Sequence, residues 1–270
     1  MPKSNSLLQS VTQSLMWFLF FSAGLLVSCW LAWHILAQVN FAFPLGYKAL
    51  DIEQHIQHFG PQNRYKQGFE NTTEEEHYRL FGEIVKSIQN GGHGLAEITY
   101  SIPGKSNTPL LRNPEVVHLT DVGKLIDFFY ASSWIGIFIL CVCIGYFYHK
   151  QQTMPSAKSV ALGVGGFVIV CVAVVLGVGP KAVFYWLHIQ IFPADHEWFF
   201  YYQDSLMTTL MKAPDIFGLI AVQIAALALA FYSAILFVTQ RTLSKNSPAK
   251  VPANGTKPTR KKQTPGKKKR

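Results

Sequence analysis

The sequence predicts an all-α membrane protein with four transmembrane helices and a small mixed α/β extracytoplasmic subdomain between the first two. Only 14% of the 270 residues are charged, whereas about 25% is usual in soluble domains. Four apolar runs are each long enough to cross the roughly 30 Å hydrocarbon core as a helix of about 20 residues. They span about residues 15–37, 125–147, 160–182 and 216–238. The alternative, a soluble protein, would need four buried helices of this length, so transmembrane helices are favoured.

The first apolar run could also be a secretory signal peptide. It is longer than the roughly 7–15 apolar residues of such a peptide, and it contains Trp30, Trp33 and His34. We therefore expect a retained signal-anchor helix, preceded by a cytoplasmic N-terminus over residues 1–14.

Positive charge is concentrated at the end of the chain and predicts the topology. Residues 241–270 hold 11 Lys and Arg and no acid, so the remainder is slightly negative although the whole chain carries +9. The short connection at about 149–159 is also basic. By the positive-inside rule, this connection and both termini face the cytoplasm. Regions 38–124 and 193–215 then face outward from a cytoplasmic (inner) membrane.

The basic tail, residues 241–270, is rich in Lys, Pro and Thr. This composition cannot bury apolar surface and predicts disorder. Because no aromatic residues are interleaved with the charges, we expect contacts with anionic lipid and no nucleic-acid partner.

The outward region 38–124 is long enough for an ordered subdomain. Residues 51–59 are typical of a short helix, and a second helix is predicted from Thr73, where a hydroxyl cap precedes acidic residues. Residues 98–102 and 109–112 are typical of a small hairpin. After the third apolar run, the helix is expected to continue in amphipathic form to Phe192.

Two histidines fall where apolar runs reach the membrane surface, and an ionisable ring at that depth is costly without a partner or a task. His118 precedes the second run, and Asp121, one helical turn on, is placed to hold its ring. His188 follows the third run, among aromatic residues. Each alone is also consistent with an ordinary interfacial histidine. The predicted topology places both at the outer face, where adjacent helices would bring them together.

Other chemistries find little support in the residues. The four cysteines, Cys29, Cys141, Cys143 and Cys171, all lie in apolar runs, which indicates packing and no disulfide framework. His118, His188 and Asp121 would suffice for a metal, but no HExxH or short His-x-His pattern supports one. Phosphate-binding loops, dinucleotide fingerprints and GxSxG elbows are absent from the sequence, so no cofactor is expected.

Two motifs carry a resemblance to a known family. The first is Val117-His118-Leu119-Thr120-Asp121-Val122. The second runs from Leu187-His188 to Phe192 and continues through Trp198, Asp204 and Met207 to Pro214-Asp215-Ile216-Phe217. With four helices and a long first outward loop, the chain resembles the bacterial membrane-protein family that includes the lipoprotein intramolecular transacylase, Lit. The resemblance covers most of residues 10–240, and the stretch from Asp51 to Glu76 is similar to a separate, less characterised branch.

The resemblance implies a reaction, in which an acyl chain moves from the sn-2 position of a lipoprotein's diacylglyceryl group to the α-amino group of its N-terminal cysteine. The family's two essential histidines would fall on His118 and His188, with Asp121 holding a ring. Membrane lipids and a diacylated lipoprotein would be the partners. Substrate contacts are expected from the side chains that surround His188, namely Trp186, Gln190, Phe192 and Trp198. The aromatic run 198–202 would form a shelf around the lipid or simply the interfacial belt.

Two other functions remain open from the sequence. A non-enzymatic sensor or assembly factor would bind a partner through the outward subdomain, with histidines that respond to pH. A transporter is less consistent with the chain, because few charges lie inside the apolar runs and no long internal repeat is visible.

Overall fold

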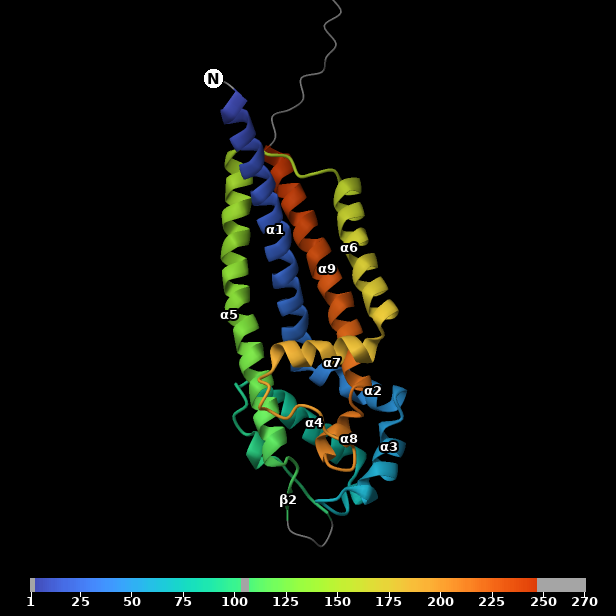
Figure 1. Ribbon diagram of the computed structural model, residues 1–270. Helices are drawn as coiled ribbons and strands as arrows, with labels where there is room; N and C mark the ends of the chain where they lie inside the picture. The colour runs from blue at the N-terminus through green and yellow to red at the C-terminus, as the bar shows by residue number, and fades with distance from the viewer. Residues whose placement is uncertain (1–2, 103–106, 247–270) are drawn as a thin grey trace, which may run out of the picture.

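Four long helices dominate the computed structural model, which describes residues 3–102 and 107–246 (Figure 1). They are α1 (Lys3–Gln38), α5 (Asn113–His149), α6 (Ala157–Val178) and α9 (Asp215–Asn246). All four contain a stretch long and apolar enough to cross a membrane. The predicted fold class is therefore confirmed, because an α-helix satisfies every backbone hydrogen bond internally where no water is present.

The long helices are longer than the apolar runs that predicted them. α1 begins at Lys3, within the segment that was predicted as a cytoplasmic N-terminus, and α9 continues to Asn246, six residues into the predicted tail. α5 begins at Asn113, twelve residues before its apolar run, so His118 lies in its first two turns. Helix propensity and capping residues extend each helix beyond the bilayer. The apolar pattern marks only the part of the helix that lies within the bilayer. Tail residues 247–270 lie outside the described part of the chain.

The membrane bundle is held by α1, which lies between α5 and α9 (Figure 1). A buried cluster joins these helices. The rings of Trp17 and Phe147 stack there at a centroid distance of 3.8 Å. Phe20 and Phe147 are fully buried. Aromatic packing of this kind supplies contact area where apolar lipid offers no hydrophobic driving force between helices.

The region predicted to face outward is a small mixed subdomain at one end of the bundle (Figure 1). Its helices are α2 (Phe43–Ala49), α3 (Ile52–Phe59), α4 (Glu74–Ile88) and α8 (Leu206–Met211), with 3₁₀ turns η1 (Asn40–Ala42), η2 (Gly60–Gln62), η3 (Phe69–Asn71) and η4 (Leu95–Glu97). Thr73 caps α4 as predicted, accepting a hydrogen bond from the Glu76 backbone N–H. The predicted hairpin is present but short, with β1 (Thr99–Tyr100) antiparallel to β2 (Thr108–Pro109).

The expected continuation of the third membrane helix to Phe192 is wrong. α6 ends at Val178, and a separate helix, α7 (Pro180–Ile191), lies across the end of the bundle next to the subdomain (Figure 1). Gly179 between them has φ +95°, which L side chains rarely adopt. Pro180 lacks the N–H that a continuing helix would need, yet it suits a first turn. His188 therefore lies on a crossing helix and not at the end of a spanning one.

Candidate functional site

One face of α5 carries the residues around which the site is built. Glu115, His118 and Asp121 recur every three residues, so they share this face. The first turn is fixed locally, because Pro114 suits the helix start and the Glu115 carboxylate accepts the Arg112 backbone N–H at 2.5 Å. The segment that follows α7, from Phe192 to Ser205, contacts this face at three levels.

At the middle level, the structure brings the two predicted histidines together. The ring centroids of His118 and His188 are 6.0 Å apart. Phe192 contacts both rings, at 4.9 Å from His118 and 5.2 Å from His188, and Phe200 lies 6.2 Å from His118. His118 is 8% exposed. The pair thus lies in an aromatic enclosure between α5 and α7.

The two rings differ in what holds them. His188 Nδ1 lies 2.8 Å from the Phe184 carbonyl oxygen. Because a carbonyl only accepts, Nδ1 donates, and Nε2 of the neutral ring is left as an acceptor. Burial lowers the pKa of His188, and the bond to Phe184 offsets this only in part. Within the described residues, the His118 side chain has ring contacts and no hydrogen bond, so its nitrogens remain available to a substrate.

Asp121 does not hold the His118 ring, and that expectation is wrong. Its carboxylate accepts a hydrogen bond from His196 Nδ1 at 2.5 Å and lies 3.4 Å from Lys124 Nζ. The i, i+3 spacing places Asp121 on the right face, but the short side chain turns toward the outward loop that packs over α5. His196 was missed as a partner, because nothing in the sequence shows which residue of a loop 75 positions away reaches Asp121.

At the level nearest the start of α5, Glu115 pairs with Ser205. Both side chains are fully buried. The Ser205 hydroxyl donates to the Glu115 carboxylate, and it also accepts from the Thr208 backbone N–H to cap α8. A buried carboxylate requires such partners, so this contact fixes the end of the outward loop on α5.

The predicted substrate-contact residues divide into two groups. Phe192 and Trp198 lie at the pair, with the Trp198 ring 4.9 Å from that of His188. Trp186 and Gln190 do not lie there, because both are exposed. They stand two residues from His188, which turns them toward the opposite side of α7.

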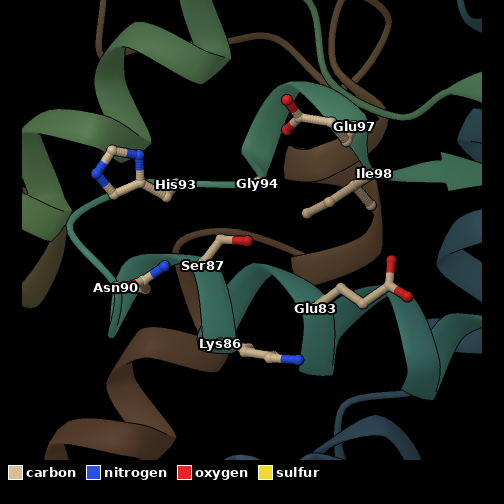
Figure 2. Close-up of a pocket in the computed structure, with 8 residues that line it drawn as sticks. All are labelled: Glu83, Lys86, Ser87, Asn90, His93, Gly94, Glu97 and Ile98. Atoms are coloured by element: carbon tan, nitrogen blue, oxygen red, sulfur yellow. The ribbon is translucent and has the colours of Figure 1, made fainter.

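Neither of the two described surface hollows is at the histidine pair. One, of about 390 Å³, is lined by polar residues of α4 and the following loop, including Glu83, Lys86 and Glu97 (Figure 2). The other, of about 440 Å³, lies beside it on α4. Across residues 3–102 and 107–246, His, Cys, Asp and Glu do not gather in threes to hold a metal ion.

One protein family matches the part of the chain that contains this arrangement. Residues 96–213, which contain both histidines, match the sequence model of the family described as lipoprotein intramolecular transacylase Lit. This segment of the chain is similar to the Lit family. The matched segment includes α5, α7 and the outward loop that joins them to α8, and therefore the whole three-level contact described above.

The fold of known Lit structures extends over nearly the whole chain. This chain matches two in meso structures of the membrane integral Lit from Bacillus cereus, with TM-scores of 0.62 and 0.61. In these two variants one histidine is replaced, by arginine in the first and by alanine in the second. Each match has 14% sequence identity, covers 91% or 89% of this chain and covers 98% of the Bacillus cereus chain. No protein of curated function matches the sequence. The shared fold and the four apolar helices identify a multi-pass membrane protein.

Proposed function

We propose that this protein is a membrane-embedded acyltransferase that moves an acyl chain from the diacylglyceryl group of a lipoprotein to the amine of its N-terminal cysteine. The observation that carries the proposal is the His118–His188 pair, 6.0 Å between centroids, enclosed by aromatic rings at one end of a membrane bundle. The match of residues 96–213 to the Lit family supports the reaction class.

The pair is suited to transfer without a cofactor. His188 Nε2 is free to take a proton from the attacking amine, whose pKa is near 8. His118 is free to donate an N–H hydrogen bond to the ester oxygen, and the proton taken by His188 passes to that oxygen as the C–O bond breaks. One C–N bond forms, one C–O bond breaks, and the amine proton ends on the glyceryl hydroxyl. Because donor and acceptor belong to one substrate molecule, positioning alone gives a large rate advantage. An acyl-histidine intermediate would use the same two rings.

The surroundings are suited to a lipid substrate. Phe192, Phe200 and Trp198 present apolar faces to the pair, while the outward subdomain lies where a lipoprotein's polypeptide would extend into water. We place the site on the outward side of the inner membrane, with both termini in the cytoplasm. The basic end of the chain would then touch anionic lipid.

The test is mass spectrometry of the N-terminal lipopeptide of an abundant lipoprotein. Cells lacking this protein are compared with cells producing wild type, His118→Ala, His188→Ala or His93→Ala. His93 is exposed in the outward subdomain and serves as the matched control. We expect an acyl chain on the cysteine amine with wild type and His93→Ala, and a loss of about 10²- to 10⁴-fold with either of the others.

Identical lipopeptides in all strains would contradict lipoprotein transacylation. That result would favour the alternative function, a sensor or assembly factor whose outward subdomain binds a partner.

A further inference from the structure

We propose that His196 is a positioning residue of the His118/His188 site and acts through Asp121. The inference rests on the proposed function. His196 Nδ1 donates to the Asp121 carboxylate at 2.5 Å. Asp121 lies one helical turn after His118 on the same face of α5. The Asp121–His196 contact therefore attaches the loop after α7 to α5, the helix that carries His118.

The position of His196 in its loop shows which residues of the site this attachment holds in place. Its backbone N–H donates to the Pro193 carbonyl at 3.1 Å, closing a tight turn. Directly before this turn stands Phe192, which contacts both histidine rings. Two residues after His196 stands Trp198, whose ring lies 4.9 Å from that of His188. Phe192 and Trp198, the two aromatic residues of this loop that contact His188, thus lie on either side of His196 in the sequence.

The opposite end of the segment is already fixed by the fully buried contact between Ser205 and Glu115. Between Phe192 and Ser205, Phe192 and Phe200 meet α5 only through ring contacts with His118. Among the described residues, the Asp121–His196 contact is the second polar attachment of the segment to α5. The Asp121 side chain is 11% exposed and that of His196 is 33% exposed, so the attachment lies at the rim of the enclosure and not among the reacting groups.

The experiment is a double-mutant cycle on the purified full chain in lipid nanodiscs, with a synthetic diacylglyceryl lipopeptide as substrate. We expect His196→Ala and Asp121→Ala each to lower kcat about tenfold with little change in KM, because small misplacement of reacting groups is costly. The double variant should be no worse than either single variant, since both remove one contact. His196→Asn keeps a donor near the Nδ1 position and should restore most of kcat.

Lys124→Gln is the matched control, because it removes the other partner of Asp121 without touching the loop. We expect it to match wild type. If the two alanine effects multiply in the double variant, or if His196→Asn is as impaired as His196→Ala, the positioning role is overturned.

Hydrogen–deuterium exchange separates this inference from the proposed function. Asp121→Ala should accelerate backbone exchange in residues 194–200, and Lys124→Gln should not, whether or not the protein transfers acyl groups. Inactive wild type would contradict the proposed function alone. Unchanged exchange in Asp121→Ala would overturn the attachment alone.

Discussion

At the scale of single residues, the site combines two fixed contacts with one open position. Glu115 and Asp121 are each occupied by a partner from the outward loop. Between them, His118 meets aromatic rings but has no hydrogen bond within the described part of the chain. A buried ring without a polar partner is costly in a purely structural setting. The open position is therefore the one where substrate atoms would complete the hydrogen bonding.

The lowered pKa of His188 predicts a pH profile for acyl transfer. Burial favours the neutral ring, so His188 remains a base as the pH falls to its ordinary value near 6.5 and is protonated only below it. The acceptor amine has a pKa near 8, so its reactive neutral form becomes protonated at a higher pH than His188 does. The logarithm of the rate should fall with unit slope between about pH 7.5 and 6.5, and steepen only below that range. Rate measurements on a lipopeptide substrate check this.

The residual activity of His188→Gln is the control for the profile. The pH profile of this variant should keep the unit slope that comes from the amine. It should lack the steeper fall at lower pH that comes from protonation of His188. Steepening above pH 7 in the wild type would mean that the ring titrates at or above its ordinary pKa, and would contradict the prediction.

At the scale of elements, α5 joins the subdomain to the membrane bundle, and a glycine contact fixes its position. A Cβ on Gly123 would lie 2.8 Å from the Gly91 carbonyl carbon and 2.8 Å from the Gly92 nitrogen. These are backbone atoms of the turn after α4, which cannot move aside as a flexible side chain would. The close approach places the start of α5, and His118 with it, against the subdomain.

Gly123→Ala should therefore destabilise the protein. Overpacking of this kind typically costs about 1–3 kcal/mol. Gly145, on the same helix, has only open space within 4 Å of the position that a Cβ would take. Gly145→Ala should be neutral or slightly stabilising, because alanine favours helix by about 1 kcal/mol. Thermal unfolding in detergent measures both. Equal melting temperatures for the two variants would show that the glycine contact does not hold α5.

At the scale of the whole molecule, the chain is polarised from end to end. The start of α1, the α5–α6 connection and the end of α9 lie together at one end (Figure 1). The subdomain, α7 and the histidine pair lie at the other. The clustering of Lys and Arg at the first of these ends favours its placement in the cytoplasm.

Labelling with a membrane-impermeant thiol reagent tests this orientation. The native cysteines all lie in spanning helices, so single cysteines are introduced at two exposed positions. Ala96→Cys, in the subdomain, should be labelled in intact cells whose outer barrier has been permeabilised. Lys150→Cys, in the α5–α6 connection, should be labelled only after the inner membrane is disrupted. The reverse pattern would place the histidine pair on the cytoplasmic side.

The sequence by itself determined the four spanning helices, because the length of an apolar run is set by the thickness of the bilayer. It also determined the faces of α5, since helical spacing is local. The approach of His118 and His188 was predicted from topology. The pairs Asp121–His196 and Glu115–Ser205 were decided only by the tertiary structure, because their members are 75 and 90 residues apart. The sequence predicted a continuous helix to Phe192, whereas the structure ends α6 at Val178 and turns α7 across the bundle, which brings His188 to α5.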